Sequence, residues 1–232
     1  MELEDERIKH AVRHTEILRA PKQSLYTFGM TNIYYYLLTQ PVYSELTKET
    51  SETVIREGRV IAQKPRIVTP YYLAHLEGFS TEARRYFESL MNQYGKNIAG
   101  LFYTYKNEPK ELNIVSDNLL SVVDRLNAEI DKRGENLAAI IKGEDQFWDV
   151  SLLKFIFELT RRSAQDNMTQ LGNRGLFNMD SRGIPADARI GIEELFRKVS
   201  RGESEPRELK DELDRWGLFD EYEDRFFTLF GK

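Results

Sequence analysis

The spacing of apolar residues changes twice along the chain. From Leu3 to Leu18 these residues recur near helical spacing and Pro21 stops the pattern, which predicts a helix over residues 3–19. β-branched and aromatic runs bounded by glycine or proline follow, as in strands, over residues 26–28, 33–39 and 53–55. After residue 116 the helical spacing returns. The pattern predicts an α+β fold, with a small antiparallel sheet in the N-terminal half and a helical C-terminal half.

The sheet region contains two sequences typical of hairpin turns. Glu57-Gly58 separates two short β-branched runs, and glycine readily adopts the positive φ that a two-residue turn requires. Residues 107–109, which read Asn-Glu-Pro, separate the run 100–106 from the run 111–115. We therefore predict one β-hairpin around each of these turns.

The remaining segments carry helix signals. Thr69-Pro70 is typical of a helix start, and Ser80 is typical of a second N-cap. Helices are predicted over residues 71–77, 81–94, 118–133, 135–142, 145–172, 186–200, 206–216 and 219–230. We expect residues 1–116 to form the sheet region and residues 117–232 the helical region, packed together as one compact unit.

One short pattern occurs twice in the C-terminal half. The pattern consists of leucine, three variable residues, Gly-Leu-Phe and then Asn or Asp. It begins at Leu171 and again at Leu213. Glycine after a helical run is typical of a helix C-terminus, where it adopts the left-handed conformation and the next apolar residue folds back on the last turn. We interpret the two copies as two similar helix ends, since a helical repeat needs at least three.

Aromatic residues are divided unevenly along the chain. Eleven of the twelve tyrosines lie between residues 26 and 105, and nine of the thirteen phenylalanines lie after residue 146. A tyrosine ring with its polar tip suits a surface that is dry on one side and wet on the other, whereas phenylalanine favours closed cores. The division predicts a tyrosine-rich, partly exposed surface in the first half and a packed helical body in the second.

Composition removes several classes of chemistry. The chain has no cysteine, so disulfides, thiol nucleophiles, Cys-type zinc sites and iron–sulfur clusters are excluded. The longest apolar run, Ile33 to Leu38, is too short to span a membrane, and the acidic N-terminus lacks the order of a signal peptide. A net charge of −5 gives no support to general binding of nucleic acid. We expect a cytoplasmic protein with no cofactor and no membrane partner.

The histidines give the nearest approach to a metal site. His10 and His14 are four residues apart, so on a helix they share one face at chelating distance. No third ligand with recognisable spacing lies nearby in the sequence, and the neighbouring Arg7 and Arg13 oppose a divalent cation. We interpret the pair as a polar or interface face of the helix and keep it as a weak metal candidate. No phosphate loop, dinucleotide fingerprint or nucleophile elbow is found, so we lean against an enzyme.

Two groups of aromatic residues are candidates for a protein interface. The first is the tyrosines of the predicted sheet, where alternation along a strand places rings on both faces. The second is one face of the last helix, where aromatic residues follow helical spacing. The candidates are Tyr34, Tyr35, Tyr36, Tyr103, Tyr105, Phe219, Tyr222, Phe226 and Phe230. Packing into the protein's own core is the alternative for both groups.

A cluster of basic residues around the first predicted hairpin provides a second hypothesis. Basic side chains beside tyrosine rings can contact phosphates and stack on bases. The candidates are Arg56, Arg59, Lys64, Arg66, Tyr71 and Tyr72. The same charges also protect a strand edge from unwanted pairing, which is the simpler interpretation.

These patterns lead to three functional hypotheses. The first is a non-enzymatic interaction or assembly protein that binds itself or a protein partner through the tyrosine-rich sheet or the C-terminal aromatic helix. The second is a nucleic-acid-binding protein that uses the basic hairpin. The third is an enzyme whose site is assembled from residues distant in sequence.

Overall fold

The computed structural model of the chain describes residues 2–41, 52–75 and 99–230. The chain divides into two compact units, of which the first comprises residues 1–64 and 103–167 and the second residues 65–102 and 168–232. Each unit is therefore built from two separate stretches of chain. The expected boundary at residue 116 lies inside the first unit. The predicted helix over residues 81–94 lies outside the described residues.

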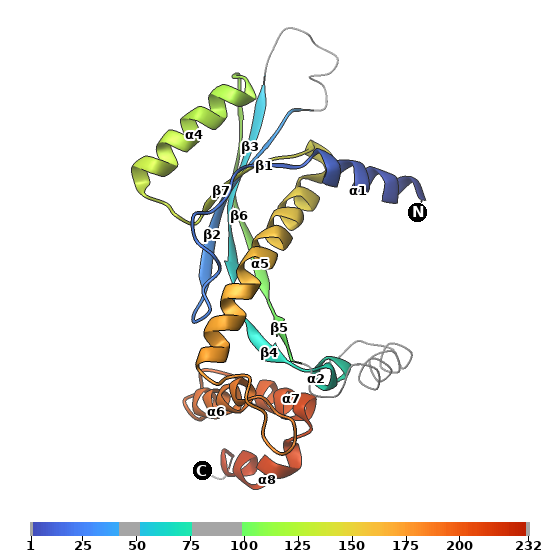
Figure 1. Cartoon of the computed structure of the whole chain (residues 1–232), viewed down its shortest axis with the longest axis vertical. Coiled ribbons are helices and arrows are strands. Elements are labelled where there is room, and N and C mark those ends of the chain that lie inside the picture. Colours follow the sequence, from blue (N-terminus) through green and yellow to red (C-terminus); the bar gives the residue numbers. More distant parts are fainter. Residues whose placement is uncertain (1, 42–51, 76–98, 231–232) are drawn as a thin grey trace. The chain divides into compact units, whose positions relative to one another are not determined.

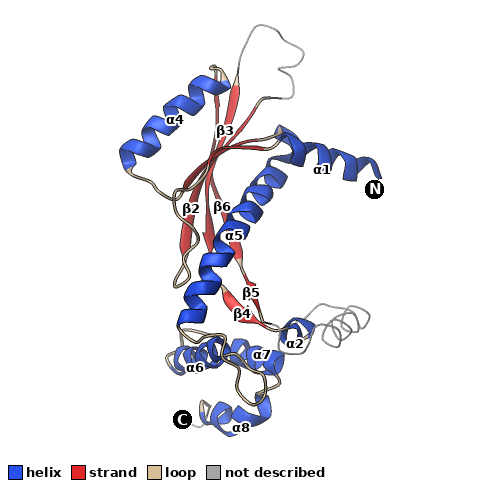
Figure 2. Cartoon of the chain, viewed as in Figure 1, coloured by secondary structure: helices blue, strands red, loops and turns tan. Residues whose placement is uncertain are grey.

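A five-stranded sheet forms the centre of the first unit (Figure 1). Its strands in spatial order are β1 (Glu16–Arg19), β7 (Ala138–Lys142), β2 (Thr31–Thr39), β3 (Thr53–Ala62) and β6 (Tyr105–Val115). Neighbours are antiparallel except β2 and β7, which are parallel. The predicted α+β class is confirmed, but the sheet is mixed rather than purely antiparallel (Figure 2).

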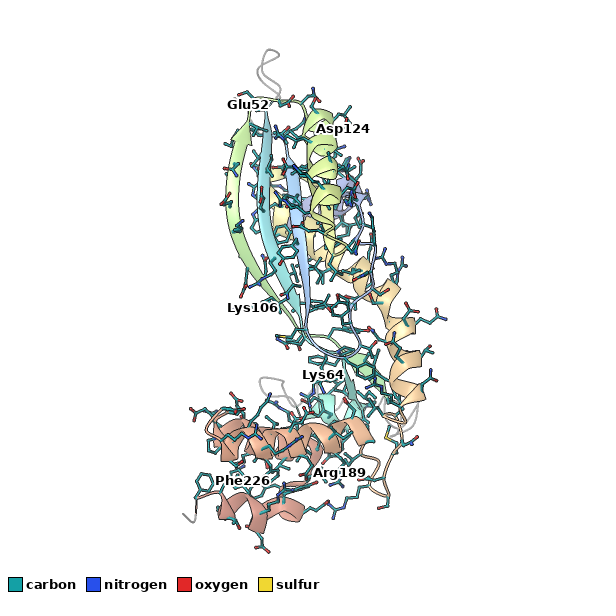
Figure 3. The ribbon with its side chains drawn as sticks, turned by 90° about the vertical axis from the view of Figure 1, so that its left-hand side faces the viewer. Glu52, Lys64, Lys106, Asp124, Arg189 and Phe226 are labelled. Atoms are coloured by element: carbon teal, nitrogen blue, oxygen red, sulfur yellow. The ribbon has the colours of Figure 1, made fainter. Side chains whose placement is uncertain are left out.

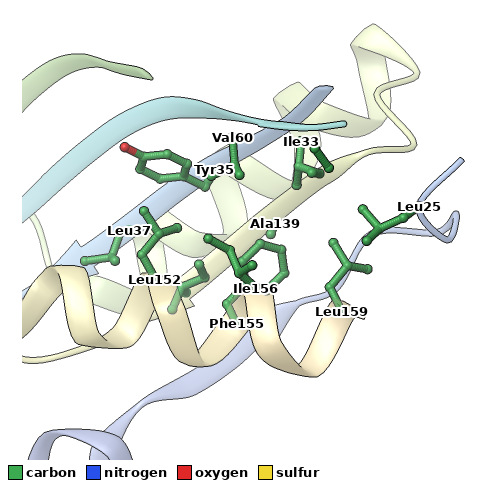
Figure 4. Close-up of a cluster of buried hydrophobic side chains, with 12 residues drawn as sticks. Leu25, Ile33, Tyr35, Leu37, Val60, Ala139, Leu152, Phe155, Ile156 and Leu159 are labelled. Carbon is green, nitrogen blue, oxygen red and sulfur yellow. The ribbon is translucent and has the colours of Figure 1, made fainter. Parts of the chain in front are cut away.

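Helix α5 (Trp148–Asn173) covers one face of this sheet. Its residues up to Asn167 belong to the first unit. Figure 4 shows its apolar side chains pointing at the strands, with Phe155 and Ile156 beneath Ala139. The other members of this cluster include Leu25, Ile33, Tyr35, Val60, Ala62, Ile141, Leu152 and Leu159. Burial of this cluster is the main stabilising contribution on the α5 face.

Helix α4 (Leu119–Arg133) covers the opposite face. Asn118 caps its N-terminus, where the Asn118 side chain accepts a hydrogen bond from the backbone N–H of Ser121. Gly134, in the left-handed conformation, caps its C-terminus. Val122, Leu126 and Ile130 follow helical spacing, and their buried side chains pack against the sheet. The sheet therefore has a helix on each face, and its two edge strands among the described residues are β1 and β6.

The hairpin predicted at Glu57-Gly58 is wrong. Both residues lie inside β3, which runs without a break alongside β2. Glycine is required at position 58 for space rather than for a turn, because a Cβ there would lie 2.3 Å from the hydroxyl oxygen of Tyr35. The Tyr35 ring is buried and occupies the place of the missing side chain.

The hairpin predicted at residues 107–109 is also wrong. Residues 105–115 form one long strand, β6, and Pro109 lies at an irregularity in its register with β3. Proline is tolerated there because an edge strand has one side on which no ladder hydrogen bond is needed. The helix predicted over residues 135–142 is instead strand β7, since a short buried apolar run does not distinguish the two structures.

The N-terminal helix ends earlier than predicted. Helix α1 covers Glu2–His14, and residues 16–19 of the predicted helix form β1. The Lys154 ammonium of α5 donates to the carbonyl oxygens of Val12 and Thr15, each at 2.9 Å. A cation at a helix C-terminus stabilises the free carbonyls there, so α5 fixes the point where α1 stops.

The second unit is mostly helical. Its elements are β4 (Arg66–Val68), α2 (Pro70–Ala74), β5 (Gly100–Phe102), the end of α5, α6 (Ala186–Ser200), α7 (Pro206–Trp216) and α8 (Phe219–Thr228). Strands β4 and β5 form an antiparallel pair. The buried carboxylate of Glu212 accepts hydrogen bonds from Arg66, Tyr72 and Trp216. These bonds join α7 to β4 and α2, and they satisfy a charge that would otherwise be costly to bury.

The two copies of the glycine pattern are helix ends, as predicted. Gly175 and Gly217 both have positive φ, at 68° and 64°. After each glycine, the backbone N–H of leucine donates to the carbonyl oxygen of the leucine five residues earlier, Leu176 to Leu171 and Leu218 to Leu213. These are the hydrogen bonds of a Schellman motif. No helix in the described part of the chain is long and apolar enough to cross a bilayer.

Candidate functional site

Strand β6 is an unpaired edge of the sheet. It has β3 on one side and, within residues 2–41, 52–75 and 99–230, no strand on the other. Figure 3 shows it as the outermost strand, with Lys106 toward one end. At eleven residues it is the longest strand described, so its outer side presents a long row of backbone donors and acceptors.

The two halves of this edge differ in chemistry. The first half contains Lys106, Pro109 and Lys110 and the irregular register, all of which discourage pairing with another strand. The second half, residues 111–115, has none of these features. There Leu112 and Ile114 are 57% and 56% exposed, whereas apolar side chains of a strand normally pack on a core. The second half of β6 is therefore the part that is able to pair.

Both apolar side chains lie on the face of the sheet that α5 covers. Leu112 is opposite Arg56 and Ile114 is opposite Val54, and opposed residues of antiparallel strands share a face. Arg56 in turn lies opposite Leu37, and Leu37 packs against α5. The Arg56 guanidinium lies over the ring of Trp148, the first residue of α5.

Helix α5 adds two exposed apolar residues near the same edge. Leu153, Phe157 and Thr160 share one side of the helix by their spacing. The Thr160 hydroxyl is hydrogen-bonded to the hydroxyl of Tyr105 in β6, so this side of α5 faces β6. Leu153 and Phe157 are both mostly exposed. We call Leu112, Ile114, Leu153 and Phe157 together the β6–α5 surface.

The tyrosines predicted as interface residues mostly pack inside the first unit. Tyr35 is buried on the α5 face and Tyr36 on the α4 face, which confirms that rings occupy both faces. Burial raises the pKa of both hydroxyls. Tyr34 is the exception, since its ring is substantially exposed. The central tyrosines of the predicted interface are thus core residues of this unit.

Tyr103 and Tyr105 belong to the same core. Their rings stack with centroids 6.4 Å apart, so they lie on the same side of the chain. The Tyr103 hydroxyl donates to Asn167 at 2.8 Å, and burial raises the pKa of this hydroxyl to about 12. Helix α5 therefore covers these rings, as the alternative interpretation of packing expected.

The aromatic face of the last helix packs inside the second unit. Phe226 is buried, and Phe219 and Tyr222 pack beside it against α6 and α7. Phe230 remains exposed, with its ring in edge contact with Phe226. Figure 3 shows Phe226 pointing into this cluster. Of the four predicted interface residues in this helix, only Phe230 offers a large surface to solvent.

The basic residues of the nucleic-acid hypothesis are engaged in ion pairs. Arg56 pairs with Asp145 at 2.8 Å and Arg59 with Glu108, whereas Arg66 pairs with the buried Glu212. Lys64, the last residue of the first stretch of the first unit, is half-buried. Tyr72 is buried beside Trp216, and Tyr71 is partly exposed beside His75. The positive charge of this region is thus largely offset by acidic residues from other elements.

A polar cavity of about 440 Å³ lies on the α4 side of the sheet. Its lining includes Tyr34, Tyr36, Glu57 and Arg133, which come from three different stretches of sequence. Arg133 donates to the Tyr36 hydroxyl at 3.3 Å, and burial raises the pKa of Glu57. The enzyme hypothesis stays a prediction, and this cavity is the place to test it.

Reasoning from the sequence missed the β6–α5 surface. The alternation in residues 111–115 does place Leu112 and Ile114 on one face, but the predicted turn at residues 107–109 hid the strand to which they belong. Leu153 and Phe157 lay inside a helix whose apolar residues outnumber its buried positions.

Comparison with known proteins gives the chain no family. No protein-family model, curated protein or solved structure matches it. Function is therefore inferred from geometry and chemistry alone.

Proposed function

We propose that this is a non-enzymatic assembly protein that associates with a second copy of itself through the C-terminal half of β6. The observation that carries the proposal is the unpaired edge at residues 111–115, with Leu112 and Ile114 exposed beside it. We also propose the cytoplasm as its location, as expected from the sequence.

The sequence of this edge is complementary to itself. An antiparallel pair of β6 strands with a two-fold axis at Asn113 places Leu112 of each copy opposite Ile114 of the other. Apolar side chains then meet on the α5 face, and the two Asn113 amides meet on the other face, where they can hydrogen-bond to each other. Pro109 and Lys110 fall outside the paired segment. The two sheets would continue into one another through backbone hydrogen bonds.

The expected affinity is moderate. Burying a leucine or isoleucine side chain completely contributes about 1.5–3 kcal/mol, so two half-exposed residues from each copy contribute about 3–6 kcal/mol in total. Association costs about 4–15 kcal/mol in lost translational and rotational freedom. Backbone hydrogen bonds and partial cover of Leu153 and Phe157 must provide the surplus. We therefore expect a dimer that dissociates on dilution.

Sedimentation velocity over a hundredfold range of protein concentration tests the proposal. The wild-type chain, 27.2 kDa as a monomer, is expected to shift toward the dimer as concentration rises. The double variant Leu112→Lys, Ile114→Lys is expected to stay monomeric, because like charges would face each other across the strand pair. Ile190→Lys is the matched control, since Ile190 is 44% exposed and lies on α6 in the second unit.

Two results would contradict self-association. One is a wild-type chain that remains a monomer at every concentration. The other is a dimer that persists in the double variant while its circular dichroism matches the wild type. A monomer that binds an unrelated protein only when Leu112 and Ile114 are intact would instead assign the edge to a different partner and overturn the choice of a second copy.

A further inference from the structure

A cluster of metal-binding side chains lies at the other side of the first unit, away from β6. One ring nitrogen of His10, one of His14 and a carboxylate oxygen of Glu144 lie within 4.8 Å of one another. The His10 Nδ1 is 2.6 Å from Glu144 Oε1, and the His14 Nδ1 is 3.8 Å from the same oxygen. The fold thus provides the third ligand type that the neighbouring sequence lacked, from a position 134 residues beyond His10.

Helix α1 orients the two histidines. They are one turn apart near its C-terminal end, and their ring centroids are 3.9 Å apart. The His14 Nδ1 is 2.8 Å from the carbonyl oxygen of His10. Because a carbonyl oxygen only accepts, Nδ1 carries the proton and the lone pair of a neutral ring is on Nε2. Nε2 is therefore the atom of His14 that would bind a metal, and the 3.8 Å contact of its Nδ1 shows only that the ring lies beside Glu144. Histidines that bind metals commonly donate their second nitrogen in this way, which fixes the tautomer of the ligand.

Two of the cations near the cluster, Arg7 and Lys142, are engaged with other groups. The Arg7 guanidinium donates to the Gln146 side chain at 2.6 Å and lies over the Phe147 ring. The Lys142 ammonium forms an ion pair with Glu16 at 2.8 Å. The sequence argument that Arg7 opposes a divalent cation is therefore weakened, since its guanidinium is directed at other groups.

We propose that His10, His14 and Glu144 bind a divalent transition-metal ion, with zinc as the first candidate. Two imidazoles and one carboxylate form a ligand set that zinc accepts, with metal–ligand distances of about 2.0–2.2 Å. Ligand atoms at that radius lie roughly 3.4 Å apart in a tetrahedral site, so small side-chain rotations must separate His10 Nδ1 from Glu144 Oε1, which are 2.6 Å apart without a metal. All three have room to rotate, since the two histidines are 61% and 57% exposed and Glu144 is 31% exposed.

Three protein ligands leave at least one coordination position open. A cavity of about 460 Å³ adjoins the cluster, and its lining includes Glu16, Gln40, Lys142 and Asp145. Water or a small anionic ligand can occupy the open position from this cavity. The inference is independent of self-association, because β6 contributes no residue to the cluster.

Metal binding would also fasten α1 to the rest of the unit. His10 and His14 are on α1, whereas Glu144 follows β7 and precedes the 3₁₀ turn η2 (Asp145–Phe147). A bound ion would therefore add a cross-link between the N-terminal helix and the loop after β7. A ligand that binds only the folded chain raises its stability by mass action.

Zinc binding to the full chain purified without a histidine tag tests the proposal. Isothermal titration with Zn²⁺ is expected to give one site per chain, and a cobalt-substituted sample is expected to show the visible absorption of a low-symmetry site. His14→Gln and Glu144→Gln are each expected to weaken zinc binding by at least about 100-fold, since even residues that only support a ligand contribute 10–100-fold.

His75→Gln is the matched control. The His75 Nδ1 is 2.8 Å from the carbonyl oxygen of Tyr71, four residues earlier, and its ring lies beside the Tyr71 ring. The local geometry repeats that of His14, but residue 71 is a tyrosine instead of a second histidine. His75→Gln is therefore expected to leave zinc affinity unchanged.

Three outcomes would overturn the site. The first is the absence of stoichiometric zinc binding by the wild-type chain. The second is equal loss of affinity in His75→Gln and His14→Gln, which would indicate nonspecific binding to surface histidines. The third is full affinity in Glu144→Gln, which would leave only the two histidines as ligands. Circular dichroism of each variant distinguishes loss of the site from loss of the fold.

Discussion

The two edges of the five-stranded sheet are built differently. The β1 edge is four residues long, has irregular register with β7, and carries Glu16 and Arg19 in ion pairs. The β6 edge is eleven residues long, and its last five residues present Leu112 and Ile114 to solvent. Short length, charge and irregular register are the features by which natural sheets prevent pairing at an edge. One edge is thus closed within the chain, and the other is open in its second half.

The closed edge is also reinforced by helices. Arg19 of β1 donates to Asn127 and Asp131 of α4, and Lys154 of α5 binds the end of α1 just before β1 begins. The Thr15 and Ser151 hydroxyls are hydrogen-bonded at 2.7 Å in a buried position. Contacts of this kind join both helices to the β1 edge, whereas the hydrogen bond from Thr160 of α5 reaches β6 near its first residue, Tyr105. This difference is one reason for the proposal that the second half of β6 binds a partner.

The largest expected effect comes from breaking the support of the open edge. In Gly58→Ala the new Cβ would meet the buried Tyr35 ring, whose hydroxyl donates to Asn107 of β6 at 3.1 Å. Displacing a packed ring costs about 2–3 kcal/mol, so urea denaturation is expected to show that loss of stability. Self-association is expected to weaken as well, because β3 holds β6 in register.

Gly100→Ala is the control for this change. Gly100 lies in strand β5, and a Cβ there meets nothing within 4 Å. Its stability is expected to change by no more than about 0.5 kcal/mol. Equal destabilisation in the two variants would show that the effect comes from alanine in a strand and not from the Tyr35 ring.

A smaller effect is expected at the closed edge. Lys154→Met removes the ammonium that binds the carbonyl oxygens of Val12 and Thr15, while keeping much of the side chain's length. Hydrogen bonds to charged groups contribute about 1.5–3 kcal/mol, and partial exposure reduces this to roughly 1 kcal/mol here. Hydrogen exchange in α1 is expected to accelerate by about fivefold, with self-association unchanged.

Lys22→Met separates this effect from a general loss of charge, since Lys22 is exposed and pairs only at the surface with Asp131. Its hydrogen exchange in α1 is expected to match the wild type. If Lys154→Met instead weakened the dimer as much as the substitutions in β6, the two edges would not be independent.

The smallest expected effect is the loss of folding stability at low pH. The β1 and β6 edges are expected to respond to acid alike. Lys106 and Arg59 lower the pKa of Glu108 in β6 to about 2, and Arg19 and Lys22 lower the pKa of Asp131 beside β1 to about 2. Because each folded-state pKa lies below its ordinary value, both pairs stabilise the fold above about pH 4.5. That contribution is lost as pH falls toward 2.

Urea denaturation at neutral pH and near pH 3 measures this response in Glu108→Gln and Asp131→Asn. Each variant is expected to lose less stability on acidification than the wild type, by similar small amounts, because both carboxylates are at the surface. A large difference between the variants would mean that acid acts mainly on one edge.

The long helices were predictable because helical spacing of apolar residues over many positions distinguishes a helix from other structures. Helix α4 was predicted over 118–133 and found at Leu119–Arg133, and α6 and α7 match their predicted ranges. Strand β7 was not predictable, because its sequence Ala-Ala-Ile-Ile fits a buried strand and a helix equally well. Gly58 and Pro109 resemble turn residues, but one makes room for a ring and the other lies on an edge. Their roles depend on neighbours that only the fold supplies.

The candidate sites follow the same division. His10 and His14 were recognisable as a pair from their spacing, but Glu144 was not recognisable as their partner, because it follows a strand that was predicted as a helix. The tyrosines suggested the sheet as an interface, yet Tyr35 is buried beneath α5 and Tyr36 beneath α4. Among the described residues, Leu112 and Ile114 are the most exposed apolar side chains of the five-stranded sheet, and they lie beside a run that resembles a turn.

Oxidative cross-linking at Asn113 tests the central claim most directly. The chain has no cysteine, so Asn113→Cys carries a single thiol. With a two-fold axis at this residue, the two Cα atoms would lie about 4.5–5.5 Å apart, within the range that a disulfide spans. Mild oxidation is therefore expected to give a covalent dimer in high yield. Glu111→Cys is the register control, since its two copies would lie roughly 13 Å apart, and Leu120→Cys on α4 controls for random collision. Efficient dimer formation by Asn113→Cys alone is the predicted result; equal yields from all three variants, or none from Asn113→Cys, would contradict pairing of the open edge.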